Sequence, residues 1–399
     1  MSTTGNESVK QIESLQPALM SERTSKVLRS FSRIGLALAL MGGGAQAAEH
    51  SILVMQALTG PSAFVGVSIR DGMLLAIDES NKKQELGAGN SLKAITADDA
   101  SDRNQTLTLL QRHAADPNVL MVMGPTSGAA AVAGANAAND LKIPLMSTTN
   151  SFDVLKAGPW SHILTQPPVV SLPYIVKYAV EKLQIKNCTL IGIHDIEIYT
   201  LMQKQFEDGV KARGVRIGSV EAIKSSDADF SALATKVTSM DQDCVFVSAT
   251  APQGANIILQ LRQAGLDPKV KILGHVTMTS PQFIQRGGAA VEGVYVMGDW
   301  LVGGRDEASR AFARDFKTRY NAEADGWNAV GYSAMRVAIA AIKKAGPNPS
   351  REAVRVALAK TKDVPVVVGG GKYSFDEQRV PTYGMNVLQV KSSQFVIAP

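Results

Sequence analysis

The chain has 399 residues, of which 45% are hydrophobic, 19% charged and 6% aromatic, and its formal net charge is +5. This length allows two globular domains, because one hydrophobic core rarely grows beyond about 250–300 residues. The composition excludes a fully disordered or collagen-like chain. Basic and acidic residues are mixed along the sequence, and no basic tract alternates with aromatic residues, so nucleic acid is not expected as a partner. No apolar stretch reaches the ~20 residues of a membrane-spanning helix.

The N-terminal segment has the three parts of a secretory signal peptide in the expected order. A basic flank, a short apolar core and an A-x-A site follow one another at residues 26–33, 34–41 and 45–47. The glycine run at 42–44 argues against the alternative, a buried helix at the start of a domain. We therefore predict a signal peptide over residues 1–47, cleaved before Ala48, and export to the periplasm. Whether translation starts at Met1 or Met20 stays open.

The remaining chain alternates between short β-branched runs and amphipathic stretches with Ala and Leu at helical spacing. The expected strands are residues 52–57, 92–97, 119–123, 143–146, 188–193, 215–222, 244–249, 270–273 and 294–297. The expected helices are residues 68–80, 103–115, 128–141, 199–213, 230–240 and 254–265. Apolar strands that alternate with helices indicate parallel sheets covered by helices on both faces.

Two blocks of this alternation are separated by Thr165-Gln166-Pro167-Pro168, where proline ends a strand. After Met297 the pattern changes. The expected elements are then helices at 306–320, 328–344 and 349–360, followed by a hairpin-like tail at 385–391 and 394–397. The glycine run Gly369–Gly371 lies between the last helix and this tail.

We interpret residues 165–168, Gly298 and Gly369–Gly371 as three crossings between two lobes. The prediction is an α/β protein with two doubly wound parallel-sheet lobes joined by a three-segment hinge. Lobe 1 and lobe 2 are expected at residues 48–166 plus 299–368 and at residues 167–298 plus 369–399, respectively. Sheets of this kind bind ligands at the carboxyl ends of their strands, so a ligand cleft is expected there, between the lobes.

The two cysteines, Cys188 and Cys244, each open an expected strand. If these strands are parallel neighbours, both thiols lie at the same end, and strands about 4.8 Å apart can carry a disulfide. Two small buried thiols are the alternative. An exported protein meets an oxidising compartment, so both possibilities stay open. Two cysteines without a histidine cluster do not make a zinc site.

The sequence contains no catalytic motif that we would defend. Its five histidines show no HxxxH or HExxH spacing, no serine lies in GxSxG, and no GxxxxGK[ST] loop is present. The loop after the first expected strand, residues 59–66, does not match GxGxxG. His194-Asp195 at a strand end suggests acid–base chemistry only weakly, and a solvated turn is the simpler interpretation. We therefore expect a protein that is not an enzyme, with no catalytic residues, no cofactor and no metal.

Two strand ends are rich in groups that can bind an anion. Residues 123–130 run from a strand into an alanine-rich helix, where Ser127 can cap the helix and free backbone N–H groups favour negative charge. Ordinary helix capping is the alternative. The second strand ends in Ser147-Thr148-Thr149-Asn150-Ser151, and five consecutive hydroxyl or amide side chains are more than a turn requires. Together these loops can hold a carboxylate.

An ordered set of short motifs covers nearly all of the chain after residue 48. In order, they are Thr59-Gly60-Pro61 with Gly66, Asp98-Asp99-Ala100, Gly124-Pro125 with Ser127-Gly128, Ile143-Pro144 with Ser147, His194-Asp195 with Tyr199, Asp229-Phe230-Ser231, Leu261–Gly265, Gly331–Ala334 and Tyr373–Asp376. No single motif is decisive, but the set resembles the periplasmic solute-binding proteins of ABC importers, of the branched-chain amino acid (Leu/Ile/Val) type. The resemblance implies the type I periplasmic binding fold.

In that family, Ser and Thr groups and backbone amides of the first lobe bind the ligand carboxylate. The resemblance gives this role to Ser127, Thr149 and Ser151, with Thr148 and Asn150 beside them. It also implies an apolar wall and further contacts from Phe64, Tyr199, Ala251, Val276 and Trp300. The implied partners are a small-molecule carboxylate and an ABC permease complex in the inner membrane. We expect the protein itself to be a monomer.

One departure from the family concerns the ligand's amino group. Amino-acid binders of this type place an acid after the strand that ends at Leu273, but residues 274–280 contain none. The tyrosine expected after the strand ending at Ala249 is also missing. Because a buried, unpaired ammonium costs several kcal/mol, we expect an aromatic or other organic acid without an α-amino group. The alternatives are an amino-acid binder that uses Asp195 or Glu197, and a ligand-sensing receptor module.

Overall fold

A computed structural model describes residues 48–399 except residues 61, 303 and 305, and these residues form one compact unit. The predicted signal peptide, residues 1–47, lies outside the described residues. Within the described part of the chain, no helix combines the length and the apolar character needed to cross a membrane.

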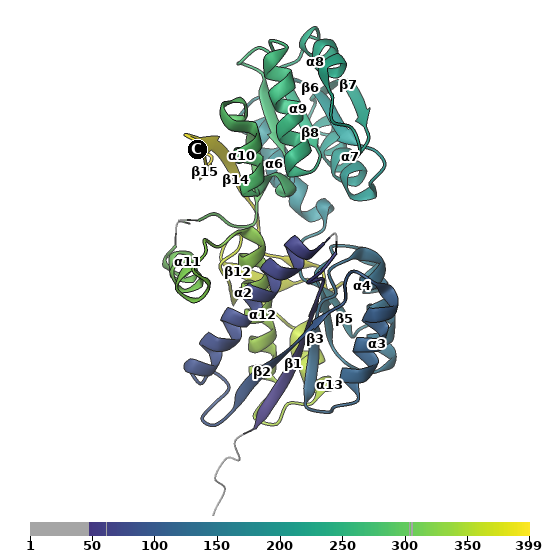
Figure 1. Ribbon diagram of the computed structural model, residues 1–399, viewed down its shortest axis with the longest axis vertical. Helices are drawn as coiled ribbons and strands as arrows, with labels where there is room; N and C mark the ends of the chain where they lie inside the picture. Colours follow the sequence, from purple (N-terminus) through teal and green to yellow (C-terminus); the bar gives the residue numbers. More distant parts are fainter. Residues whose placement is uncertain (1–47, 61, 303, 305) are drawn as a thin grey trace, which may run out of the picture. The chain divides into compact units, whose positions relative to one another are not determined.

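The first sheet, sheet A, is five-stranded and parallel throughout, with the strand order β2-β1-β3-β4-β5 (Figure 1). Its strands are β1 Glu49–Gln56, β2 Ser91–Asp98, β3 Val119–Met123, β4 Leu145–Ser147 and β5 Ser161–Ile163. The helices that connect them are α2 Ala63–Lys82, α3 Arg103–Ala114, α4 Gly128–Asp140 and α5 Phe152–Lys156. Strand β1 is buried on both faces, since Ile52 and Val54 belong to one core cluster and Leu53 and Met55 to another. This explains why β1 is an apolar run rather than an alternating one.

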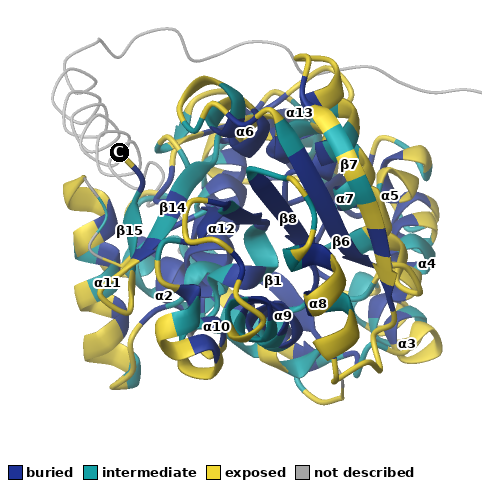
Figure 2. Ribbon diagram, turned by 90° about the horizontal axis from the view of Figure 1, so that it is seen from above, coloured by how far each residue is buried: buried dark blue, intermediate teal, exposed yellow. Residues whose placement is uncertain are grey.

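The second sheet, sheet B, is seven-stranded, with the order β15-β14-β10-β9-β8-β6-β7. Its strands are β6 Asn187–Ile193, β7 Arg216–Ile223, β8 Cys244–Ser248, β9 Lys271–Gly274, β10 Tyr295–Gly298, β14 Asn386–Lys391 and β15 Gln394–Ile397. Its helical segments are α6 Pro168–Glu181, α7 Glu197–Lys211, α8 Ser231–Thr238, α9 Ala251–Gln263, η1 Val276–Thr279, α10 Pro281–Gly287 and η2 Gly288–Val291. Figure 2 shows β6 and β8 buried along their length, whereas the edge strand β7 is partly exposed.

The two sheets share one topology. The parallel strands β6 to β10 are ordered β7-β6-β8-β9-β10, which repeats the pattern β2-β1-β3-β4-β5. The hairpin β14–β15 adds two antiparallel strands beyond β10, so sheet B is mixed rather than purely parallel. The predicted α/β class with two doubly wound sheets is confirmed. The strand order reverses between β1 and β3 in sheet A and between β6 and β8 in sheet B. Ligands bind at such reversal points in doubly wound folds.

Three further helices and a small sheet complete the described chain. They are α11 Glu307–Tyr320, α12 Gly326–Lys344 and α13 Arg351–Ala359, with β11 Val364–Pro365, β12 Lys372–Phe375 and β13 Pro381–Thr382. Helix α12 packs closely against α2 because Gly331 has no side chain. A Cβ atom there would lie 2.1 Å from the carbonyl oxygen of Ile69. The α12 side chains that face α2 join the same core cluster as Ile52 and Val54.

The two cysteines form a disulfide, which decides between the two possibilities left open by the sequence. Cys188 and Cys244 are directly opposite each other in the parallel pair β6–β8. Both are fully buried. The covalent bond therefore joins two neighbouring central strands of sheet B at their amino ends.

Near the C-terminus, the chain joins sheet B later than the glycine run Gly369–Gly371. Gly369–Gly371 do not lead directly into sheet B, because Tyr373, Phe375 and Tyr383 belong to the core cluster of sheet A and α12. The chain joins sheet B only at β14, which begins at Asn386. We propose that the third crossing lies near Gly384, since the aromatic side chains before it are anchored in the first core.

Candidate functional site

A fully buried glutamine, Gln56, organises the carboxyl ends of three strands of sheet A. Its Nε2 donates to the carbonyl oxygen of Met123 at the end of β3, at 3.0 Å. Its Oε1 accepts hydrogen bonds from the hydroxyl groups of Thr126 (2.8 Å) and Thr148 (3.0 Å). Gln56 is the last residue of β1, which lies between β2 and β3 in the sheet. Its side-chain amide therefore fixes the loops after β3 and β4 to the end of β1.

The loops after β3 and β4 also contact each other directly. The carbonyl oxygen of Pro125 accepts hydrogen bonds from the Ser147 hydroxyl (3.0 Å) and the Thr148 backbone N–H (3.1 Å). Gly124 allows this arrangement, because its φ is +127° and a Cβ atom would lie 1.6 Å from the carbonyl oxygen of Met55. The structure therefore brings together the two polar loops that the sequence suggested for a carboxylate.

The individual side chains of these loops have different roles. Ser127 is the N-cap residue of α4, but its side chain makes no cap hydrogen bond and instead donates to the Ser101 carbonyl oxygen at 3.3 Å. The expectation that its side chain caps the helix is wrong. The Ser151 hydroxyl caps α5 by accepting from the Asp153 N–H, and the Thr149 hydroxyl accepts from the Ser151 N–H. Ser127, Thr149, Asn150 and Ser151 are all partly exposed, whereas the hydroxyl of Thr148 is buried against Gln56.

Asp98, at the end of β2, holds the loop between β1 and α2. Its carboxylate accepts hydrogen bonds from the backbone N–H groups of Leu58, Thr59 and Ala100 and from the Thr59 hydroxyl. Burial raises the pKa of Asp98, but these hydrogen bonds outweigh it and hold the pKa below its usual value. The loop leads into the first turn of α2, where Phe64 is 70% exposed.

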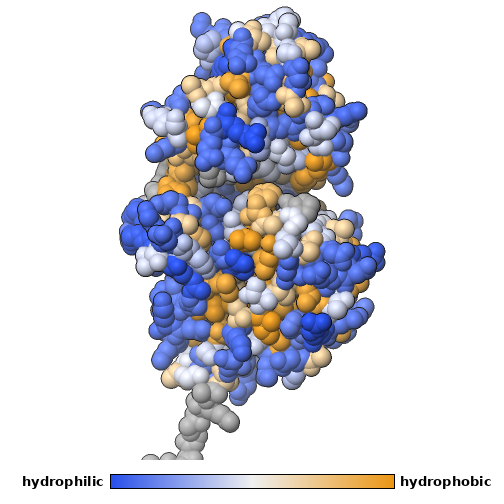
Figure 3. Space-filling view, in the orientation of Figure 1, coloured by the Kyte–Doolittle hydropathy of each residue, from blue (hydrophilic) through white to orange (hydrophobic). Residues whose placement is uncertain are grey.

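Most of the large apolar side chains that stay exposed in the described part of the chain follow the carboxyl ends of strands or lie near a crossing. They are Phe64, Phe152, Val169, Tyr174, Ile196, Leu201 and Val302, with Val220 on the edge strand β7 as the exception. Figure 3 shows apolar side chains gathered over the α2 and α12 region on the face turned to the viewer. Phe152 and Tyr174 were not expected from the sequence. Single exposed apolar side chains are normal on a protein surface, so only those that follow the strand ends of sheet A, Phe64 and Phe152, are candidates for contact with a ligand.

At the carboxyl edge of sheet B, an aromatic stack stands beside a hydroxyl. The ring of Tyr199, in α7, stacks on the fully buried His275 with centroids 5.5 Å apart. The Thr277 hydroxyl lies 3.0 Å from His275 Nδ1 and donates to the Ala249 carbonyl oxygen at 2.9 Å. Burial lowers the pKa of His275 to about 3, so its ring is neutral at physiological pH. Val276 beside it is partly exposed.

One of the two acids that the sequence suggested for a ligand ammonium is engaged elsewhere. Asp195 accepts hydrogen bonds from the backbone N–H and the hydroxyl of Ser225, which hold its pKa below the usual value. His194 Nδ1 lies 2.6 Å from the Ile223 carbonyl oxygen. His194 and Asp195 therefore bind the end of β7, as expected for a solvated turn. Ala251 begins α9 and is buried, so it offers a backbone position rather than a side-chain group.

Two polar side chains, the buried Gln166 and the half-buried Asp299, interact with a segment that is distant in the sequence. Gln166 Oε1 accepts from the backbone N–H groups of Tyr383 (3.1 Å) and Gly384 (3.3 Å), and its Nε2 donates to the Gly384 carbonyl oxygen. Burial raises the pKa of Asp299 to about 6, although a hydrogen bond with the Tyr383 side chain opposes the shift. No sequence motif marks these residues, because their partners are more than 80 positions away.

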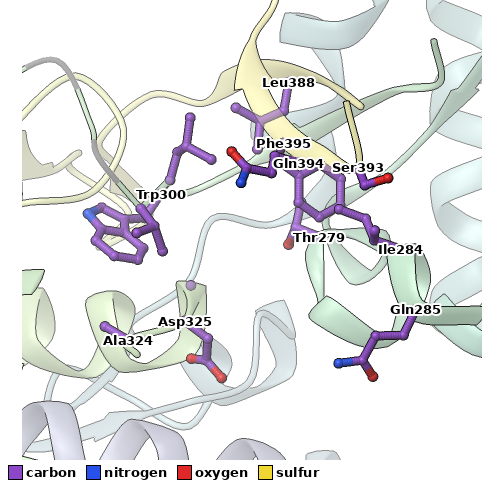
Figure 4. A pocket seen from close by; sticks show the side chains of 13 residues that line it. Thr279, Ile284, Gln285, Trp300, Ala324, Asp325, Leu388, Ser393, Gln394 and Phe395 are labelled. Carbon is purple, nitrogen blue, oxygen red and sulfur yellow. The ribbon is translucent and has the colours of Figure 1, made fainter. Parts of the chain in front are cut away.

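Trp300 differs from the other expected site residues. It is only 5% exposed, its Nε1 donates to the Ser309 hydroxyl at 2.5 Å, and its ring meets Phe312 edge-on. It lines a cavity of about 450 Å³, together with residues of η1, α10, the start of α12 and the β14–β15 hairpin (Figure 4). None of the other nine expected site residues lines this cavity.

Among the described residues, no group of three or more His, Cys, Asp or Glu side chains is arranged to hold a metal ion. The polar groups at both strand edges are hydroxyl groups, amides and backbone N–H groups. Such groups can orient and retain a small solute.

Comparisons with known proteins agree with this arrangement. A Leu/Ile/Val-binding protein of Rhizobium johnstonii is 27% identical over 82% of this chain and 88% of its own length. The structure of a branched-chain amino acid transporter substrate-binding protein from Streptococcus pneumoniae, in complex with isoleucine, has a TM-score of 0.74 at 22% identity, covering 87% of this chain and 98% of its own. A solute-binding protein of an ABC transporter from Rhodopseudomonas palustris, in complex with 3,4-dihydroxybenzoic acid, has a TM-score of 0.72 at 21% identity, covering 87% and 95%.

The family comparison spans almost the whole described chain. The model of the family described as periplasmic binding protein matches residues 50–394, which include every described strand from β2 to β14. Some of the motifs that suggested this resemblance, such as Gly124-Pro125 and His194-Asp195, lie at the strand ends described above. The chain therefore belongs to the periplasmic binding protein family.

Proposed function

We propose that this protein is the exported substrate-binding component of an ABC importer and that it captures a small carboxylate between its two lobes without converting it. Membership of the periplasmic binding protein family supports a solute-binding role. In this proposal the protein works in the periplasm as a monomer and presents its closed, loaded form to a permease complex in the inner membrane.

The carboxylate is held by the loops after β3 and β4. Ser127, Thr149, Asn150 and Ser151 offer partly exposed polar groups there, and the N-terminus of α4 adds backbone N–H groups with favourable dipole direction. Thr148 contributes to the site only through its contact with Gln56, because its hydroxyl group already donates a hydrogen bond to the Gln56 side chain. Phe64 and Phe152 flank these loops and suit an apolar or aromatic ligand body.

The observation that carries the ligand class is the nature of the sheet B edge. The segment after β9, where the family's amino-acid binders have an acid, instead presents Thr277, Val276 and a neutral His275. A ligand ammonium closed into this surface would lack an anionic partner, at a cost of several kcal/mol. We therefore favour an aromatic or other organic acid without an α-amino group. The Rhodopseudomonas palustris protein bound to 3,4-dihydroxybenzoic acid shows that this fold accommodates such ligands.

A branched-chain amino acid is the second candidate ligand. The Rhizobium johnstonii relative is named for binding leucine, isoleucine and valine. In that case Glu197, exposed in the first turn of α7, is the acid in position to meet the ammonium. A receptor module that senses the same ligand is distinguished by its gene neighbourhood, since an importer is encoded beside its permease.

A thermal-shift panel tests the ligand class directly. It contains leucine, valine, benzoate, cinnamate and short keto and dicarboxylic acids. A ligand present at 100 times its dissociation constant stabilises the protein by about 2.7 kcal/mol, which gives a clear rise in melting temperature. We expect the shift from an acid without an α-amino group and little from leucine. A strong leucine or valine shift favours the amino-acid alternative, and steady product formation detected by mass spectrometry contradicts the binding role.

A further inference from the structure

The cavity beside Trp300 has mostly apolar walls and one carboxylate. Its volume of about 450 Å³ lies in the range of small-molecule sites. The apolar walls are Ile284, Trp300, Leu301, Val302, Leu388 and Phe395. Figure 4 shows the Asp325 carboxylate at the start of α12, on the opposite side of this space from Gln285 of α10. Among the described lining residues, Asp325 is the only one with a charged side chain.

Asp325 is held firmly in place. It is the N-cap residue of α12, where its Oδ1 accepts from the Asn328 N–H at 2.8 Å and the Asn328 side chain accepts from the Asp325 N–H. Its Oδ2 accepts a hydrogen bond from the Ser68 hydroxyl at 3.2 Å. The Trp327 backbone N–H donates a further hydrogen bond to this carboxylate. Three of its about four lone-pair sites are therefore used, and one remains for another donor. Burial raises the pKa of this carboxyl group, and Asp71 nearby adds to the shift.

Ser68 connects this cavity with the expected ligand wall. Phe64 and Ser68 are four positions apart in α2, which puts them on the same face of the helix, about 6 Å apart along its axis. Asp325 bonds to one of these residues, and the other is the most exposed large apolar side chain at the strand ends. The loops that we assign to the ligand carboxylate contribute no residue to the cavity.

We propose that the cavity takes the apolar end of the ligand and that Asp325 determines specificity by accepting a hydrogen bond from a hydroxyl group on that end. The proposal rests on the proposed function, in which the ligand carboxylate is held by the loops after β3 and β4. Because Asp325 repels a second carboxylate and attracts a donor, the preferred ligand carries a carboxylate at one end and a hydroxyl at the other. The predicted ligand class is a hydroxylated aromatic acid.

Two pairs of acids of different length test the proposal by isothermal titration calorimetry: 4-hydroxybenzoate against benzoate, and 4-hydroxycinnamate against cinnamate. A hydrogen bond to a charged acceptor corresponds to roughly a tenfold or greater difference in affinity. We expect the wild-type protein to prefer the hydroxylated member of at least one pair by about tenfold. In Asp325→Ser this preference disappears, because serine is an equally good N-cap but too short to reach the hydroxyl.

Asp325→Asn is the second variant, since asparagine also preserves the N-cap and keeps a neutral acceptor; its preference should be intermediate. The matched control is Asp306→Ser, which makes the same exchange at the exposed N-cap of α11, outside the cavity lining. It should retain the full preference. Equal affinities within both pairs, or an unchanged preference in Asp325→Ser, overturn the role of Asp325 while leaving the carboxylate-binding function intact. If the wild-type protein binds none of the four acids but binds another acid of the thermal-shift panel, this inference fails and the proposed function stands.

Discussion

Replacing Gln56 by methionine tests whether the strand-end loops of sheet A hold the ligand. Methionine has nearly the same shape, but it cannot donate to the Met123 carbonyl oxygen or accept from the hydroxyl groups of Thr126 and Thr148. Each of these three buried hydrogen bonds contributes about 1 kcal/mol net, so Gln56→Met should lower the free energy of unfolding by about 3 kcal/mol. Urea unfolding at neutral pH measures this change.

The same substitution should weaken ligand binding, because Thr126 and Thr148 lie in the loops that we assign to the carboxylate. Displacing one hydrogen bond to a charged group costs about 1.5–3 kcal/mol, which is at least a tenfold loss of affinity. Calorimetry with the tightest-binding acid of the benzoate and cinnamate pairs measures it below the temperature at which the variant unfolds.

Asn139→Leu is the matched control for lost stability. Asn139 is also a buried amide with three hydrogen bonds, to the Ala135 carbonyl oxygen, the Ser161 hydroxyl and the Trp160 N–H. Ser161 begins β5, so these bonds lie at the amino end of this parallel strand, whereas the loops after β3 and β4 lie at the carboxyl ends. We expect this variant to be destabilised to a similar extent and to bind the acid like the wild type. Equal affinity in both variants would refute the assignment of the ligand to the loops after β3 and β4.

Three further predictions concern single groups. Ser127→Ala should weaken acid binding by about 1–3 kcal/mol in calorimetry with little change in stability, because the Ser127 side chain does not cap α4. Ser151→Ala should weaken binding to a similar extent and also lose about 1 kcal/mol of stability, because its hydroxyl caps α5. Normal binding by both variants would show that the carboxylate is not bound at these loops. The disulfide closes a loop with a sequence separation of 56, so removing both cysteines should cost about 4 kcal/mol in urea unfolding, and an unchanged midpoint would count against this bond. Burial, aided by Arg379 and Arg355, lowers the pKa of His162 to about 3, so the unfolded state binds the extra proton below pH 6.5 and stability is lost as the pH falls. His162→Leu should remove about 2 kcal/mol of the stability lost between pH 6.5 and 5.0, and identical pH profiles would contradict a neutral His162.

The sequence by itself determined the fold class and the order of most of the elements. Apolar runs such as Val119–Met123 became central parallel strands with the same bounds, because burial on both faces leaves no alternation to obscure the pattern. It also located the two polar loops at residues 123–130 and 147–151, because groups at the ends of parallel strands share one edge of a sheet. Family motifs then gave the kind of protein, which the family comparison confirms.

Local patterns misplaced some boundaries. The helix expected at residues 68–80 begins at Ala63, and α6 was not expected because Pro167-Pro168 suggested only a crossing. Proline is well tolerated in the first turn of a helix, where its missing N–H has no partner to lose. The glycine run Gly369–Gly371 suggested a crossing for a similar reason, but it precedes a small sheet that packs on the first core.

Only the tertiary structure decided which side chains act together. Gln56 bonds to residues 67 to 92 positions away, Gln166 reaches Gly384, and the Asp325 carboxylate meets Ser68 across 257 positions. It also decided that the Thr148 hydroxyl is donated internally and that Cys188 and Cys244 are bonded. A periodic pattern records which face of an element is buried, because burial acts on each side chain separately. Hydrogen bonds between distant residues leave no such pattern, because they depend on the packing of whole elements against one another.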